Sequence, residues 1–88
     1  MDKLPLPELA LRLAKAKEFI PQGSKWRHYK GDEYAVIDLV LYEASSEVGV
    51  VYKPLANPIV TFVRPLVEWQ DVLEHDGARV YRFRRLGI

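Results

Sequence analysis

The chain has no cysteine among its 88 residues, which excludes disulfide bridges, zinc sites built on thiolates and catalysis by a cysteine nucleophile. Charge of neither sign prevails, since 13 Lys and Arg stand against 12 Asp and Glu and leave a net charge of +1. A balance this even gives no reason to expect strong non-specific attraction to nucleic acid or to an anionic membrane. No apolar run reaches the ~18 residues of a membrane span. The first residues include Asp2 and Glu8 and lack a basic start followed by an apolar core, so we do not expect a signal peptide. We therefore expect a soluble, cytoplasmic protein.

What is present is an ordinary globular composition, with 49% hydrophobic and 28% charged residues. A chain of 88 residues can form one modest hydrophobic core and is too short to form two. The character of the chain changes once, near Pro21-Gln22-Gly23-Ser24. We therefore predict a helix and linker over residues 1–23 and a small β-barrel domain over residues 24–88.

Apolar residues recur at spacings of three and four in the first segment: Leu6, Leu9, Leu13, Ala16 and Ile20. Pro7 suits the first turn of a helix, where its missing N–H has no intrahelical partner to lose. Pro21 and Gly23 then end the helix. The pattern predicts a helix over residues 6–19 that packs onto the β domain through the leucines of this stripe and Ile20.

The rest of the chain is typical of short strands, over residues 26–30, 34–42, 48–55, 59–64, 72–75 and 79–86. A helical turn is expected at residues 66–69, and Asp76-Gly77 predicts a tight hairpin between the last two strands. Closure of a short antiparallel sheet removes the exposed edges that favour aggregation. The predicted fold class is therefore mainly β. It is a small SH3-like barrel or a strongly curved antiparallel sheet of about five strands, with an N-terminal α-helix.

The segment 34–42 is apolar on both of its alternating faces, so it needs cover on both. One face carries Ala35, Ile37, Leu39 and Leu41, and the other carries Tyr34, Val36, Val40 and Tyr42, interrupted by Asp38. We expect the N-terminal helix to cover the second face. Alternation also predicts one core that buries the following side chains together: Ile37, Leu39, Val51, Phe62 and Phe83.

Several motifs follow one another in order along this region: Trp26-Arg27-His28-Tyr29-Lys30-Gly31, Val50-Val51-Tyr52, Val63-Arg64-Pro65-Leu66, Trp69 and Arg82-Phe83. With these motifs, over roughly residues 24–86, the chain resembles a bacterial family known as domain of unknown function 1653 (DUF1653). The residues before Ser24 look like a helix added to the family core. Ala56-Asn57-Pro58 stands where relatives have a loop rich in glycine and aromatic residues. The resemblance implies a fold and no activity, because it brings no catalytic or binding residues with it.

No group of residues points to catalysis or to a cofactor. His28 and His75 are the only histidines, and they lack the close spacing of a metal-binding pair. None of Ser24, Ser45 and Ser46 lies in a Gly-x-Ser-x-Gly elbow, and no glycine-rich phosphate loop opens a helix. The carboxylates spread along one hairpin instead of converging as acid–base catalysis requires. We predict a non-enzymatic protein without metal or other cofactor.

The residues most typical of a binding surface are aromatic, with arginine beside them. Tyr, Trp and Arg dominate the hot spots of protein interfaces, and aromatics around a groove receive peptides. The same rings would otherwise fill the barrel. The candidate partner-binding residues, for a protein or peptide, are Trp26, Arg27, His28, Tyr29, Tyr52, Arg64 and Trp69.

The alternative is a surface for single-stranded nucleic acid on the last strand. Its residues are Arg79, Arg82, Arg84 and Arg85, with Trp26, Tyr29 and Tyr81 as stacking rings. Alternation divides these arginines between two strand faces. The stretch from Asp32 to Glu47 contains acids and no compensating base, so it offers them partners within the chain. We favour the intramolecular pairing, and the sequence does not indicate an oligomeric state.

Overall fold

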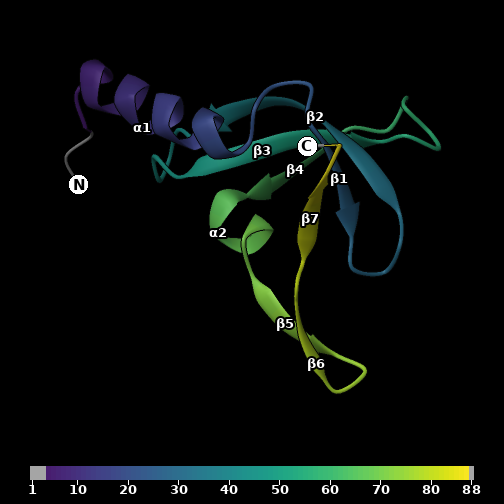
Figure 1. Cartoon of the computed structure of the whole chain (residues 1–88). Helices are drawn as coiled ribbons and strands as arrows, with labels where there is room; N and C mark the ends of the chain where they lie inside the picture. The colour runs from purple at the N-terminus through teal and green to yellow at the C-terminus, as the bar shows by residue number, and fades with distance from the viewer. Residues whose placement is uncertain (1–3, 88) are drawn as a thin grey trace.

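The computed structural model of the protein describes residues 4–87. Its elements in chain order are α1 (Leu6–Phe19), β1 (Lys25–His28), β2 (Glu33–Leu41), β3 (Val48–Pro54), β4 (Phe62–Pro65), α2 (Leu66–Trp69), β5 (Val72–His75), β6 (Ala78–Tyr81) and β7 (Phe83–Leu86). Figure 1 shows α1 at one end of a curled sheet, and the β5–β6 hairpin projecting away from that sheet. The predicted helix and the predicted helical turn are both confirmed.

Five strands form one antiparallel sheet in the order β4-β3-β2-β1-β7, which leaves β4 and β7 at its edges. The sheet curls into a half-barrel (Figure 1). After β4, the short helix α2 and the separate two-stranded sheet β5–β6 lead the chain back to β7. The prediction of a mainly β fold with a strongly curved antiparallel sheet and an N-terminal helix is therefore confirmed.

A β-bulge in β2 decides which of its side chains enter the core. The register with β3 shifts between Val36 and Asp38, so Ile37 is an extra residue with no partner in β3. An extra residue moves the alternation of the strand by one position. As a result Val36 and Leu39, at 2% and 3% exposure, are both buried in the same core. The prediction that these two side chains lie on opposite faces is wrong for this reason.

The buried hydrophobic side chains among residues 4–87 are Ala16, Ile20, Val36, Leu39, Val48, Val50, Tyr52, Trp69 and Phe83. The predicted places of Leu39 and Phe83 are confirmed. Ile37 and Val51 are only half-buried and Phe62 is 43% exposed, so the predicted core is wrong for these three. The bulge takes Ile37 out of phase, and β4 is an edge strand that leaves Phe62 with cover on one side only.

The helix α1 packs on β2 and β3 mainly through its C-terminal half. Ile20 is 1% exposed, Ala16 is buried, and Leu13 packs against the core. Arg12 ties the helix to the β2–β3 loop, because its Nη1 donates to the carbonyl of Ser46 at 2.9 Å. The first turn extends beyond the sheet (Figure 1), so Leu6 is 79% exposed and does not take part in the predicted packing.

The C-terminal segment 79–86 is two strands rather than the predicted one. β6 and β7 are separated at Arg82 and belong to different sheets. The backbone of Arg82 is held on both sides, since its N–H donates to Asp71 at 2.8 Å and its carbonyl accepts from Tyr29 at 2.9 Å. The prediction that alternation along one strand divides the four arginines between two faces is therefore wrong. The hairpin at Asp76-Gly77 is confirmed, with φ of 51° and 79°.

Candidate functional site

Two of the candidate partner-binding residues, Tyr52 and Trp69, are buried at 5% and 2% exposure. Trp69 stacks on Phe83, with 3.7 Å between ring centroids and 10° between ring planes, and Tyr52 meets Trp69 edge-on at 4.9 Å. Trp26 is half-buried, and its Nε1 donates to the hydroxyl of Ser24 at 2.9 Å. The buried rings hold α2 against β3 and β7.

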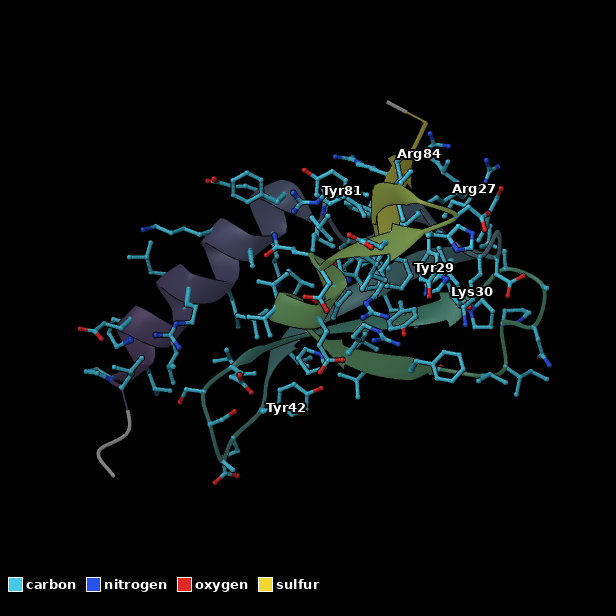
Figure 2. The ribbon with its side chains drawn as sticks, turned by 90° about the horizontal axis from the view of Figure 1, so that it is seen from below. Arg27, Tyr29, Lys30, Tyr42, Tyr81 and Arg84 are labelled. Atoms are coloured by element: carbon cyan, nitrogen blue, oxygen red, sulfur yellow. The ribbon has the colours of Figure 1, made fainter. Side chains whose placement is uncertain are left out.

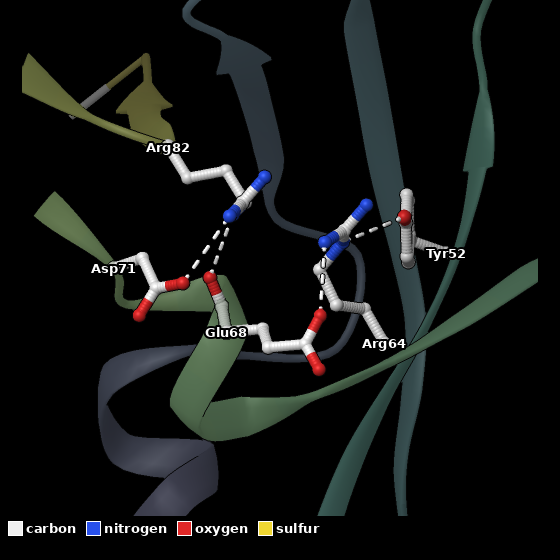
Figure 3. A network of polar contacts seen from close by, with 5 residues as sticks. All are labelled: Tyr52, Arg64, Glu68, Asp71 and Arg82. Carbon is white, nitrogen blue, oxygen red and sulfur yellow. Dashed lines mark hydrogen bonds and ion pairs between the residues drawn. The ribbon is translucent and has the colours of Figure 1, made fainter. Parts of the chain in front are cut away.

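Arg64 is held in a polar network that joins β4, α2 and β3 (Figure 3). Its Nη1 lies 3.2 Å from a carboxylate oxygen of Glu68, and its Nε donates to the hydroxyl of Tyr52 at 3.4 Å. The hydrogen bond to Tyr52 is the main cause that raises the pKa of Arg64 above its ordinary value. These contacts give Arg64 a structural task at the base of α2.

Arg82 fastens the other side of α2 (Figure 3). Its Nε donates to the backbone carbonyl of Glu68 at 2.9 Å, and its Nη2 lies 3.2 Å from the carboxylate of Asp71. One of the four arginines of the alternative surface is thus occupied within the chain. Its partners lie at residues 68 and 71, and not in the acidic stretch 32–47 that we expected to supply them.

A hollow of about 340 Å³ lies between β1 and the β5–β6 hairpin. We call it the tyrosine hollow, and it is lined by Arg27, His28, Tyr29, His75, Val80, Tyr81 and Arg84. The ring of Tyr29 meets that of His75 edge-on, with 5.1 Å between the ring centroids, so the hairpin packs against the loop that follows β1. Figure 2 shows Arg27, Tyr29, Tyr81 and Arg84 gathered around the hairpin, with Tyr42 well away from them.

A second hollow of about 360 Å³ lies between the end of α1 and β7. We call it the indole hollow, and it is lined by Phe19, Ile20, Trp26, Trp69, Gln70, Tyr81, Phe83, Arg84 and Arg85. Tyr81 and Arg84 line both hollows, so the two form one continuous surface, which we call the junction surface.

The junction surface carries positive charge that the described part of the chain does not neutralise. Within residues 4–87, no carboxylate lies at ion-pair distance from Arg84 or Arg85. Arg27, in contrast, is paired with Glu33, with 2.5 Å between Nη2 and Oε2. Two guanidinium groups beside exposed aromatic rings are suited to bind an anionic group.

His28 adds no charge to the tyrosine hollow at neutral pH. Burial lowers the pKa of His28 below its ordinary value of 6.5, and the charges of Arg64, Arg82 and Lys30 lower it further against the weaker effect of Asp32. The neutral imidazole accepts a hydrogen bond at Nδ1 from the backbone N–H of Lys30, at 3.2 Å. His28 is therefore a neutral wall of this hollow.

The described residues offer little support for a metal site, for a free carboxylate in the apolar strand or for a membrane-spanning helix. Across residues 4–87, no three His, Asp or Glu side chains form a group that could hold a metal ion. Asp38, the acid that interrupts an apolar strand, lies 3.4 Å from the ammonium of Lys17 and accepts the N–H of Leu39 at 2.8 Å. Neither helix in the described part has the length and apolar character needed to cross a membrane.

The junction surface combines residues from both predicted surfaces. Arg27 and Tyr29 come from one and Arg84 from the other, whereas Arg79 lines neither hollow. Sequence reasoning missed Phe19, because only the packing of α1 brings it beside β7. No local pattern signals such a contact between segments so far apart in the chain.

A family model described as "Protein of unknown function (DUF1653)" matches residues 24–85. A crystal structure of a DUF1653 protein from Bordetella bronchiseptica is 30% identical to this chain, with a TM-score of 0.65 over 75% of this chain and 87% of that chain. No curated protein matches the chain. The matched residues run from β1 into β7 and leave out only Leu86 of the sheet, while α1 precedes them. The chain belongs to the DUF1653 family.

Proposed function

We propose that this protein is a non-enzymatic interaction module that binds a peptide segment of a partner protein over the junction surface. The observation that carries the proposal is Tyr81, which is 65% exposed although it lies between two hollows. An exposed tyrosine beside Arg84, which has no ion-pair partner within residues 4–87, has the composition of a binding hot spot. Each hollow has room for a side chain, so an extended segment crossing Tyr81 would place one side chain on either side of it.

Single-stranded nucleic acid is the competing partner, and the charges favour it less. Such a strand needs a row of free cations along its phosphates. Arg27 is paired with Glu33 and Arg82 with Asp71, which breaks the row. The remaining free guanidinium groups on the junction surface suit a ligand with one or two negative charges better than a polyanion.

Selection from a random dodecapeptide library with free C-termini tests the proposal. Enriched peptides should share a consensus and bind the wild-type protein in solution with a Kd of about 1–100 μM, as expected of a small surface. The double variant Tyr81→Ser, Arg84→Gln should lose this binding at least tenfold. Both positions are exposed, so the variant should keep its fold, which circular dichroism checks.

Arg79→Gln is the matched control, because Arg79 is an exposed arginine of β6, the strand that carries Tyr81, and it lines neither hollow. This variant should bind the selected peptides as the wild type does. The proposal is wrong if selection yields no consensus. It is also wrong if the double variant and the Arg79 control bind equally well.

A further inference from the structure

The indole hollow has an apolar floor and an aromatic lip. Ile20, Trp69 and Phe83 are exposed by only 1%, 2% and 4%, although all three line the hollow. Phe19 lines it as well and is 68% exposed, at the end of α1. A large aliphatic or aromatic side chain that enters this hollow would cover apolar surface that water now contacts.

One residue that lines the hollow also carries an unused hydrogen-bond donor. Trp69 Nε1 is buried and has no acceptor among the described residues. Its neighbour Trp26 differs, because its Nε1 donates to the hydroxyl of Ser24. Buried polar groups in native proteins nearly always have a partner, so this indole N–H is suited to a ligand that uncovers it and brings an acceptor.

The rim of the hollow is cationic. Arg84 and Arg85 both line it, and neither has an ion-pair partner within residues 4–87. Guanidinium groups bind carboxylates through paired, charge-assisted hydrogen bonds. The ligand that complements the hollow therefore has an apolar group, an oxygen acceptor and a negative charge within the size of about one residue.

We infer that the indole hollow binds the C-terminal residue of the partner peptide, an inference that rests on the proposed function. An apolar C-terminal residue has all three features in one unit: the side chain for the floor, a carbonyl or carboxylate oxygen for Trp69 Nε1, and the terminal carboxylate for Arg84 and Arg85. An internal acidic residue meets the rim only if a separate neighbour fills the hollow. The hollow is thus a reader of free, apolar C-termini.

The test uses acetyl-Ala-Ala-Leu with a free carboxylate and the same peptide as its C-terminal amide. The two tryptophans give two indole N–H signals in a nitrogen–proton correlation spectrum of the full chain, and Trp26→Phe assigns them. The free acid should move the Trp69 signal downfield as it gains an acceptor. It should also bind about tenfold more tightly than the amide, which corresponds to one charge-assisted hydrogen bond.

Arg84→Gln or Arg85→Gln should reduce this preference for the acid, while Arg79→Gln should change neither the preference nor the affinity for the amide. Equal affinity of acid and amide would overturn the inference, as would a Trp69 signal that neither peptide moves. Hexanoate bound as tightly as the peptide acid would mean that the hollow binds a free small acid instead. Library peptides that bind equally well after amidation would refute this inference and still support the proposed function.

Discussion

Phe83 is the residue on which most of the core converges. Its ring stacks on Trp69, meets Tyr52 at 5.7 Å and Tyr34 at 5.9 Å, and meets His28 at 5.1 Å from the edge of the tyrosine hollow. It therefore joins β7 to α2, β3, β2 and β1 at once. Removal of such a ring costs the transfer of its carbons and leaves a cavity that the neighbours cannot close.

We expect Phe83→Ala to lower the free energy of unfolding by about 3–5 kcal/mol, which is a large share of the stability of a domain this size. Phe62→Ala is the matched control. Phe62 is 43% exposed on an edge strand, so its loss should cost about 1 kcal/mol or less. Urea unfolding of both variants measures the difference, and equal costs would contradict this description of the core.

His28 should make the stability of the fold dependent on pH. Its pKa in the folded protein lies below the 6.5 of the unfolded chain, so below 6.5 the unfolded chain binds the proton first. The contribution of His28 is therefore complete above 6.5 and is lost as the pH falls through the folded pKa. His28→Asn keeps an acceptor for the N–H of Lys30 and does not titrate.

Thermal melting between about pH 8 and pH 5 should show a smaller loss of Tm on acidification for His28→Asn than for the wild type. A proton NMR titration of the wild-type imidazole should place the midpoint for His28 below 6.5. Parallel melting curves, or a midpoint at or above that value, would show that burial does not disfavour the charged form.

At the scale of elements, most of the fold could be predicted from periodicity and turn chemistry. The helix 6–19 and the Asp76-Gly77 hairpin came from local signals, because proline, glycine and apolar spacing act within a few residues. The bulge at Ile37 and the break at Arg82 could not be found in this way. Both are fixed by contacts with distant strands: the register with β3, and the hydrogen bonds to Asp71 and Tyr29.

The candidate site was predictable only as a set of residue types. Residue type singles out Arg27, Tyr29 and Arg84 as side chains suited to binding, but their common location depends on how the hairpin folds back toward β1. Trp69 has the same binding chemistry by type and is buried. Burial is a property of tertiary packing, so residue type alone cannot separate an aromatic hot spot from an aromatic core.

Deletions in α1 test how much this helix contributes to the hydrophobic core. Deleting residues 1–22 removes Ala16 and Ile20 from the core and should uncover apolar surface, raising binding of a hydrophobic dye and self-association. Deleting only residues 1–10 removes Leu6, which is exposed, and should change neither. If the longer deletion leaves a monomer with an unchanged Tm, α1 is a detachable extension of the domain.

At the scale of the whole molecule, the arginines that hold the fold are distinct from those without an ion-pair partner within residues 4–87, and this difference has the widest consequences. Arg82 donates to a backbone carbonyl of α2 and pairs with Asp71, and these contacts connect the half-barrel to the segment that leads into the hairpin. Arg84 is two residues away, exposed and unpaired within the described chain. Two arginines of one short segment thus differ in what their removal should change.

Arg82→Gln should lower the free energy of unfolding by about 1–3 kcal/mol, because it leaves a backbone carbonyl and a carboxylate without their charged donor. Arg84→Gln should alter stability by no more than about 0.5 kcal/mol, as is usual for an exposed side chain, and Arg84 has no ion-pair partner within residues 4–87. Peptide binding should show the reverse order: the Arg84 variant should lose the selected peptides, and a folded Arg82 variant should keep them.

Neither the Arg82 variant nor the Arg84 variant should bind a fluorescent oligothymidylate at physiological salt. Micromolar oligonucleotide binding that weakens in both variants, with a smaller salt dependence for each, would instead indicate a phosphate-binding surface that includes both arginines.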